Sequence, residues 1–334
     1  MERNIISMCS INVCGLKSKM KYNVLESYLN SFQFICLTET KCKSVEEIEI
    51  SGYKPFVMSK MCTKHIYGGI HGICILVKDS IATHCTMKTD FVSESILWLY
   101  VDQNVLGYDF ILGAVYLPHE ASVHYHDYVF EYLSNDLITI GATFNVPVIL
   151  LGDFNARTGI TNDFEYDLNE LDFLMDNDQC AEYFENNNLM SRVNKDQLIN
   201  GNGKKLIELC KMADLKILNG RIGKDCNIGN FTCHTAKGKS TIDYAIASMC
   251  MFPKFADFYI DILDKCMSDV HCPVCVYISS DKIPCNVSEV NISNADNSKY
   301  IMNKRARSRW KQDLSEQYIA SFNMNEIEKF HSFN

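Results

Sequence analysis

The chain has 334 residues, 47% of them hydrophobic and 22% charged, which is the composition of a globular protein with one large α/β domain or two small ones. Its formal net charge of −9 excludes a surface that is basic all over, so nucleic-acid contact would need a local basic patch or metal ions that offset the phosphates. No apolar run approaches the ~20 residues of a membrane span, and residues 1–16 lack the apolar core of a secretory signal.

The first predicted unit is a strand, a helix and a second strand. Residues 4–13 alternate enough to predict a strand that ends in Asn12 and a turn. Apolar residues at helical spacing predict a helix over 22–29, and 34–37 is a short buried strand with Glu39 just past its end. This βαβ order places Asn12 and Glu39 at the carboxyl ends of two strands, where open α/β sheets gather their ligands.

Three strands and a helix are predicted next. A glycine turn leads into a strand within residues 68–78, and strands follow over 96–101 and 110–116. The last of these ends at Tyr116, just before a proline break. Apolar residues at helical spacing over 125–137 then predict an amphipathic helix.

The stretch ILLGDFNARTG, residues 149–159, is the feature around which the chain is organised. An apolar run over 147–151 predicts a buried strand, and Asp153, Asn155 and Arg157 follow it directly. In extended backbone Asp153 and Asn155 would point to the same side, and would present an acid that takes a proton beside an amide that donates to a developing anion. The alternative is a strand-to-turn junction where both side chains cap backbone groups.

The second half repeats the pattern of strands that end in polar groups. A helix is predicted over 204–213, and the predicted strands are 216–219, 231–232, 241–247 and 258–263. Asp243 lies inside one of these strands, where a carboxylate is costly unless it is paired or ligating. Ser268, Asp269 and His271, in MSDVHCPV, come just before the final strand.

Two composition signals have structural interpretations. Nine acids and no lysine or arginine lie between Arg157 and Arg192, without the fixed spacing and glycine of a calcium loop, so we expect a solvated loop and helix. The 16 cysteines are scattered singly, which favours reduced thiols in an intracellular protein, nuclear or cytoplasmic and not secreted. Cys272 and Cys275 form a lone CxxC that we interpret as strand and core rather than a zinc site.

Taken together, six short motifs resemble those of the endonuclease/exonuclease/phosphatase superfamily. They are INVCGL, LTET, VYLP, LGDFNAR, TIDY and SDVHCPV, and the resemblance covers residues 4–278. GDFNARTG with SDVHCPV resembles most closely the endonuclease domain of non-LTR retrotransposons, and the basic helix after it resembles the connector before the reverse transcriptase there. Because no polymerase follows, we expect a fragment, a truncated element or a domesticated copy.

The resemblance implies a fold and a domain plan. The fold is an α/β, four-layer sandwich in which two packed, mainly antiparallel β-sheets are flanked by helices, with the site at the strand ends. We expect this domain over residues 1–279, a polar linker over 280–302 and a basic helical tail over 303–334. The tail begins with five basic residues in nine, a pattern that fits a solvated helix start and a nucleic-acid contact equally well.

The resemblance also implies the residues of the site. Asp153 matches the group that orients or deprotonates the attacking water, Asp243 the acid that orients the catalytic histidine, and His271 that histidine. Asn155 and Tyr116 match phosphate-binding positions. The positions that hold a divalent metal, Mg²⁺ with Mn²⁺ as the alternative, match Asn12, Glu39 and Asp269. No other cofactor is expected.

One departure separates this chain from the family pattern. The family has Ser-Asp-His contiguous, whereas here Val270 lies between Asp269 and His271. Residues two apart on extended backbone face the same way and adjacent residues face opposite ways. Either the backbone bulges at Val270, which is plausible beside an active site, or the roles of Asp269 and His271 are rearranged. If the backbone does not bulge, His271 is misaimed and activity is low.

The leading hypothesis is a magnesium-dependent DNA endonuclease that nicks one strand and leaves a 3′-hydroxyl, as in retrotransposon target-site cleavage. Hydrolysis of a phosphodiester needs an in-line water, charge relief and help for the leaving oxygen, which these residue types supply. The alternatives are an RNA nuclease or phosphatase of the same fold, and a catalytically weak or dead relic that binds nucleic acid or protein. DNA is the expected partner, no membrane is expected, and the oligomeric state stays open.

Overall fold

The computed structural model describes residues 5–279 with the exception of 22, 43–44, 59–71, 92, 94, 124, 127 and 165–190. The chain divides into two units, residues 1–285 and 286–334, and every described residue belongs to the first. The predicted linker (280–302), the predicted basic tail (303–334) and the glycine turn before residue 72 lie outside the described residues.

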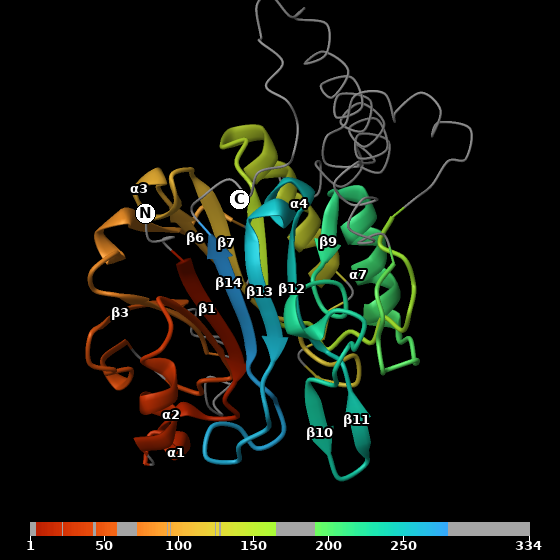
Figure 1. Ribbon diagram of the computed structural model, residues 1–334, viewed down its shortest axis with the longest axis horizontal. Helices are drawn as coiled ribbons and strands as arrows, with labels where there is room; N and C mark the ends of the chain where they lie inside the picture. Colours follow the sequence, from red (N-terminus) through yellow and green to blue (C-terminus); the bar gives the residue numbers. More distant parts are fainter. Residues whose placement is uncertain are drawn as a thin grey trace, which may run out of the picture. The chain divides into compact units, whose positions relative to one another are not determined.

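Two mixed β-sheets form the middle of this unit (Figure 1). The first six-stranded sheet has the spatial order β13 (Phe255–Ile260), β14 (Val274–Ser279), β1 (Ile5–Asn12), β2 (Phe34–Thr38), β4 (Ile73–Lys78) and β3 (Tyr53–Met58). The second has the order β5 (Cys85–Lys88), β6 (Ile96–Val101), β7 (Phe110–Tyr116), β8 (Val148–Asp153), β12 (Asp243–Ser248) and β9 (Leu215–Ile217). Only β1–β2 and β7–β8 pair in parallel among these strands, so the predicted sandwich of mainly antiparallel sheets is confirmed.

Apolar side chains hold the layers together. Successive side chains of a strand point to opposite sides, so each sheet has an inner face and an outer face. The inner faces meet in one cluster that includes Met8 and Phe34 from the first sheet and Leu112 and Ile149 from the second. Burial of each such side chain contributes ~1.5–3 kcal/mol, which fixes the two sheets against one another.

Helices cover the outer faces and complete four layers (Figure 1). On the first sheet, the short helix α1 (Leu16–Lys19) is followed by α2 (Asn23–Leu29), and both pack apolar side chains against the outer face of the sheet. On the second, α4 (Val129–Thr143) and α7 (Gly201–Met212) pack side by side, and α3 (Gln103–Leu106) is a single turn. No described helix is long and apolar enough to cross a bilayer.

The strand register brings the polar strand ends together. In the first sheet Asn12 lies beside Thr38, and Glu39 follows directly. In the second, Asp153 lies between Tyr116 on one side and Asp243 on the other. Asp243 is the first residue of β12 and Asp153 is the last residue of β8. Because the two strands are antiparallel, these residues lie side by side at the same end of the sheet.

Several elements differ from their predicted positions. The strand expected at 231–232 is β10 (Cys233–Thr235), which pairs with β11 (Gly238–Ser240) as a separate hairpin, and the strand expected at 258–263 is shifted to β13. The edge strands β3 and β5 were not predicted at all. β3 contains Pro55, which weakens the sequence pattern but is tolerated because an edge strand has only one partner.

The solvated loop expected for the acid-rich run is wrong at Asp163, the acid of that run that the structure describes, because Asp163 is buried. Asp163 forms a fully buried, two-point ion pair with Arg221 (Nη1–Oδ2 2.9 Å, Nη2–Oδ1 2.7 Å), and the other eight acids lie outside the described residues. Burial favours a raised pKa for Asp163, but the charge and hydrogen bonds of Arg221 hold its pKa below the ordinary value. The cysteines that the structure describes are free thiols, and Cys272 and Cys275 are buried, as predicted.

Gly152 directly precedes Asp153 at the end of β8, and a substitution there tests how closely β7 and β8 pack. A Cβ at Gly152 would lie 1.9 Å from the carbonyl oxygen of Val115, so Gly152→Ala must force β7 and β8 apart. We expect a loss of about 3 kcal/mol or more in the free energy of unfolding, measured by chemical denaturation. Gly141→Ala in α4 is the control, because it meets no atom within 4 Å and should stabilise the fold by about 1 kcal/mol. Equal stability of the two variants would contradict the close approach of β7 and β8.

Candidate active site

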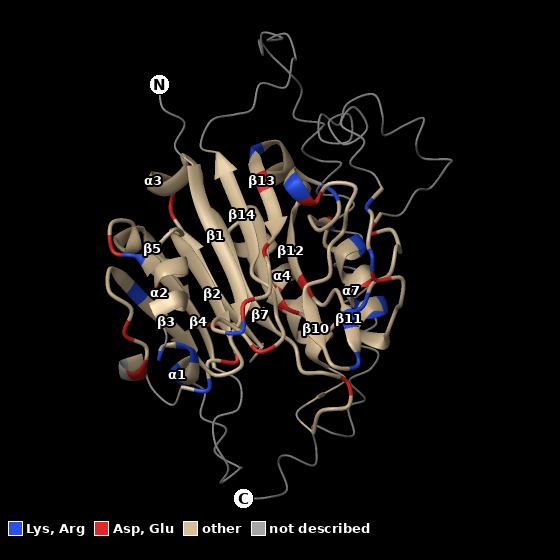
Figure 2. Cartoon of the chain, turned by 60° about the horizontal axis from the view of Figure 1, so that its bottom comes forward, with Lys and Arg blue, Asp and Glu red and all other residues tan. Residues whose placement is uncertain are grey.

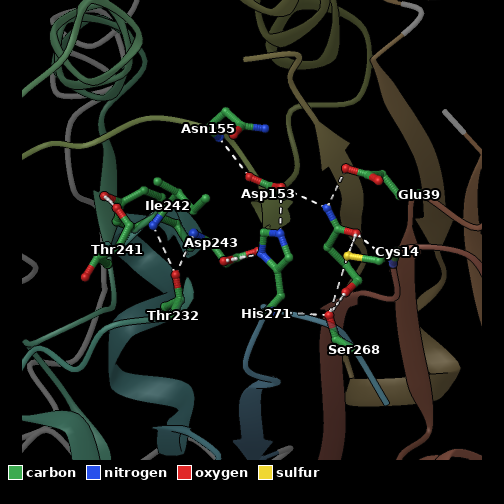
Figure 3. A network of polar contacts seen from close by, with 12 residues as sticks. Cys14, Glu39, Asp153, Asn155, Thr232, Thr241, Ile242, Asp243, Ser268 and His271 are labelled. Atoms are coloured by element: carbon green, nitrogen blue, oxygen red, sulfur yellow. Dashed lines mark hydrogen bonds and ion pairs between the residues drawn. The ribbon is translucent and has the colours of Figure 1, made fainter. Parts of the chain in front are cut away.

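Asp153, at the end of β8, lies at the centre of a buried polar cluster (Figure 3). Its Oδ2 accepts a hydrogen bond from Asn12 Nδ2 at 3.0 Å and lies 3.8 Å from His271 Nε2. Its Oδ1 accepts the backbone N–H of Asn155 at 2.9 Å. The carboxylate is almost completely buried, so each of these contacts offsets part of the cost of removing it from water.

His271 and Asp243 form an imidazole–carboxylate pair. His271 Nδ1 is 3.0 Å from both carboxylate oxygens of Asp243, which makes Nδ1–H the donor and directs Nε2 toward Asp153. Thr232 holds Asp243 in place, because its Oγ1 accepts the backbone N–H groups of Ile242 and Asp243 at 3.0 Å each. Figure 3 shows the side chains of Asp243, His271 and Asp153 in a row across the site.

Glu39 and Asn12 form the second half of the site. Asn12 Nδ2 donates to Glu39 Oε1 at 3.0 Å, in addition to its bond to Asp153, so one amide joins the two acids. Tyr116 Oη donates to the same Glu39 oxygen at 2.9 Å. Lys41 Nζ lies 3.5 Å from the other oxygen, Oε2. The predicted residues Asn12, Glu39, Tyr116, Asp153, Asp243 and His271 are thus brought together.

Asn155 lies at the site but not in the predicted conformation. The prediction assumed extended backbone, whereas Asn155 has a φ of 47° and the chain turns there. Its Nδ2 donates to the carbonyl of Leu117 at 2.9 Å, and its N–H is capped by Asp153. The capping alternative therefore describes Asn155, while Asp153 both caps and faces the site. Arg157 likewise points elsewhere, because its guanidinium binds Asp196.

Val270 is accommodated by a bend. The chain turns over residues 269–270, and the backbone N–H of His271 donates to Ser268 Oγ at 3.1 Å. The carbonyl of Val270 accepts the N–H of His234 at 2.7 Å, so the extra residue has its own partner. His271 is aimed at Asp243, which agrees with the first of the two alternatives considered for Val270.

Asp269 does not join the other predicted residues. Its side chain is 64% exposed, and its Oδ1 accepts a 2.5 Å hydrogen bond from Lys19 Nζ. The bend at Val270 explains this position, since it turns His271 inward and leaves Asp269 on the outside. The metal-side role predicted for Asp269 has no counterpart among the contacts of this carboxylate with described residues.

The pKa values of the buried groups are strongly shifted. Burial and the negative charge of Asp243 raise the pKa of Asp153 to about 7, against the opposing effects of His271 and Asn12. Burial alone would lower the pKa of His271, but attraction and hydrogen bonding by Asp243, with the charge of Asp153, raise it to about 10. At neutral pH His271 is therefore an imidazolium between two acids. Burial also raises the pKa of Tyr116, which stays a neutral donor.

Two places in the site could hold a cation. Asp153, Asp243 and His271 each offer an atom within 4.8 Å of the others, but protonated His271 already supplies the positive charge there. Glu39 is the better place, because the hydrogen bonds from Asn12 and Tyr116 both go to Oε1, whereas Oε2 has the more distant ammonium of Lys41, at 3.5 Å. A carboxylate oxygen suits Mg²⁺, whereas the amide oxygen of Asn12 accepts the backbone N–H of Cys14 and does not face Glu39.

Lys41 and Thr232 were not identified from the sequence. Lys41 is two residues after Glu39, a proximity that could have pointed to it. Thr232 contacts the backbone of Asp243 across a turn of the chain, and no local pattern signals such a contact.

Comparisons with known proteins identify the family and the fold. A model of the Endonuclease/Exonuclease/phosphatase family matches residues 9–249. Among solved structures, an AP endonuclease (LMAP) from Leishmania major superposes with a TM-score of 0.57 at 14% identity, over 83% of this chain and 88% of that one. The catalytic domain of Xenopus laevis APE2 gives 0.55 at 14% identity, over 82% and 93%. The endonuclease domain of TRAS1, a telomere-specific non-LTR retrotransposon, gives 0.53 at 13% identity, over 82% and 98%.

At these identities the solved structures show a shared fold alone. No curated protein sequence matches the chain.

The raised pKa values predict how stability depends on pH in the presence of a chelator. The native state keeps the His271 proton between pH 6.5 and about 10, whereas the unfolded state loses it at 6.5. The stabilisation is therefore complete below pH 6.5 and is lost as the pH rises through about 10, with a slope of up to about 1.4 kcal/mol per pH unit. Asp153 acts in the same direction, and its contribution falls between pH 3.8 and about 7.

The measurement is the free energy of unfolding across this pH range for wild type, His271→Gln and His126→Gln. We expect His271→Gln to flatten the decline above pH 6.5. The exposed His126 lies outside the site, so His126→Gln should leave the curve unchanged. A wild-type stability that rises over the same interval would show that His271 is not protonated in the native state.

Proposed function

The chain belongs to the endonuclease/exonuclease/phosphatase family, and on that basis we propose that it is a metal-dependent phosphodiesterase that nicks one strand of DNA and leaves a 3′-hydroxyl. The observation that carries the proposal is the buried line of Asp243, His271 and Asp153 beside the Asn12–Glu39 pair. Burying several charges in one place costs stability, and groups with strongly shifted pKa values cluster at functional sites.

The residues at this site have the properties that phosphodiester hydrolysis requires. Asp153, with a pKa raised to about 7, can take the proton of an attacking water at neutral pH. His271 can donate from Nε2 to the phosphate oxygen on which charge develops, while Asp243 holds the ring in orientation through Nδ1. Asn155 Nδ2 uses one hydrogen on Leu117, so its second hydrogen can donate to a substrate phosphate.

Glu39 would hold the metal ion, whereas the predicted ligand Asn12 would have to turn its amide, because its Nδ2 faces the acids and its Oδ1 accepts the backbone N–H of Cys14. The bonds from Asn12 and Tyr116 both go to Glu39 Oε1, so a cation at Oε2 would take the place of the Lys41 ammonium, 3.5 Å away. A bound Mg²⁺, with Mn²⁺ as the alternative, would supply charge relief on the phosphate oxygens. Tyr116 keeps Glu39 in place through its 2.9 Å hydrogen bond. Asp269 is bound to Lys19, so we do not include it among the proposed ligands.

Two observations support DNA as the substrate. Lysine positions lie on α7 and β11 (Figure 2), and Lys204 and Lys239 there are exposed, which gives some of the local positive charge that an acidic protein needs to approach DNA. The structural neighbours include a retrotransposon endonuclease domain and AP endonucleases. A duplex with an abasic site is therefore the second substrate to test.

The direct test is nicking of supercoiled plasmid DNA in the presence of Mg²⁺. Wild type should convert supercoiled to open-circular DNA, and a DNA polymerase should extend the nick because it carries a 3′-hydroxyl. Asp153→Asn and His271→Gln should each slow the reaction by at least ~100-fold, since each removes an acid–base or charge-stabilising group. Chelation of the metal should abolish it, and His126→Gln should be unaffected.

Two other outcomes would replace the proposal. If wild type is inert on plasmid and abasic duplex but still shifts DNA in a gel, the protein is a binding relic. If it neither cuts nor binds DNA, RNA and small phosphoesters become the substrates to test.

A further inference from the structure

The hydroxyl of Ser268 connects two parts of the site that lie far apart in the sequence. Its Oγ donates to the carbonyl of Asn12 at 2.6 Å and accepts the backbone N–H of His271 at 3.1 Å. Ser268 is fully buried, so water cannot replace it in either bond. One hydroxyl therefore links the end of β1, which carries Asn12, to the residue that carries the imidazole. Figure 3 shows Ser268 beside His271.

The loop around Ser268 is fixed from the outside as well. Lys19, the last residue of α1, is buried, and its Nζ donates to the carbonyl of Lys265 at 3.1 Å and to Asp269 Oδ1 at 2.5 Å. The backbone N–H groups of Met267 and Ser268 both donate to the carbonyl of Asp264 at 2.9 Å. Ser268 is consequently held on both sides in the sequence, which makes its hydroxyl a fixed point and not a mobile side chain.

His271 needs such a fixed point because its own segment is longer by one residue than the contiguous Ser-Asp-His pattern. Val270 adds two backbone torsions between the fixed loop and the imidazole, and an error of ~1 Å in the position of a catalytic group can cost on the order of 100-fold in rate. The His271 N–H···Oγ bond closes this segment into a small ring that spans the bend. Removal of the hydroxyl would leave a buried N–H and a buried carbonyl without a partner at the same time.

We propose that Ser268 is a positioning residue: its hydroxyl sets the distance between Asn12 and His271, and so keeps the imidazole on Asp243 despite the inserted Val270. The catalytic consequence rests on the proposed function, whereas the geometric consequence does not. Ser268 acts through His271 and Asn12 and does not contact the reacting groups in this scheme.

The test compares Ser268→Ala with Ser268→Thr, which keeps the hydroxyl, and with a matched serine. Ser7 is the control, because it is also buried, lies toward the other end of β1, and its Oγ is within hydrogen-bond distance of the carbonyl of Ser31, at 3.0 Å, and of Gln33 Oε1. Ser7→Ala should therefore lose a hydrogen bond of the same kind without any effect on His271.

The first readout needs no catalysis. The His271 Nδ1 proton, bound to Asp243, should give a downfield proton resonance that is assigned by its disappearance in His271→Gln. We expect the resonance in wild type, Ser268→Thr and Ser7→Ala, and its loss or broadening in Ser268→Ala. The second readout is nicking: kcat of Ser268→Ala should fall on the order of 100-fold, with KM nearly unchanged and Ser268→Thr largely restored.

The outcomes separate this inference from the proposed function. If Ser268→Ala keeps both the resonance and the kcat of Ser7→Ala, or if Ser268→Thr is as impaired as Ser268→Ala, the positioning role is wrong even when wild type nicks DNA. If wild type does not nick but the resonance responds as expected, the geometric role stands and the proposed function fails. Should Ser268→Ala not fold, Ser268→Cys retains the volume with a much weaker hydrogen-bonding group, and the same resonance decides.

Discussion

The site depends on one interaction, the attraction of a buried imidazolium, His271, for two buried carboxylates, Asp243 and Asp153. Removing three charged groups from water is costly, and their mutual attraction offsets this only when the geometry is good and the remaining polar atoms are bonded. The structure meets both conditions, because Asn12 Nδ2 and the N–H of Asn155 bind Asp153 while Thr232 fixes the backbone of Asp243. The same balance gives Asp153 a raised pKa, the property that a general base at neutral pH requires.

This balance requires the two sheets to be held rigidly. Asn12 comes from the first sheet and Asp153 and Asp243 from the second, while His271 precedes β14 of the first sheet. The contacts of Asn12 with Asp153 and of His271 with Asp243 therefore run between the sheets, and the apolar cluster between the inner faces sets their lengths. The core is close-packed and changes shape little, so it preorganises the contacts that cross it.

The departures from the family pattern are mutually consistent. One additional residue, Val270, turns Asp269 outward, and Lys19 binds the displaced carboxylate while also holding the carbonyl of Lys265. His271 stays inside the site, where its backbone N–H donates to Ser268 Oγ. The proposed metal site then has Glu39 as its acid, which is sufficient for Mg²⁺, an ion bound through one or two carboxylates with several waters.

The sequence by itself determined the strands whose burial is regular, such as β6 and β7, and the motif residues that resemble a known family, which is why the sandwich and most of the site were predicted. Local patterns report burial along one element, and they say nothing about the register between elements. Only the tertiary structure decided that Asn155 turns away from the extended direction, that Lys19 binds Asp269, 250 residues away, and that Thr232 supports Asp243. Each of these contacts joins groups whose proximity depends on how strands pair and sheets pack, a property of the whole chain and not of any window within it.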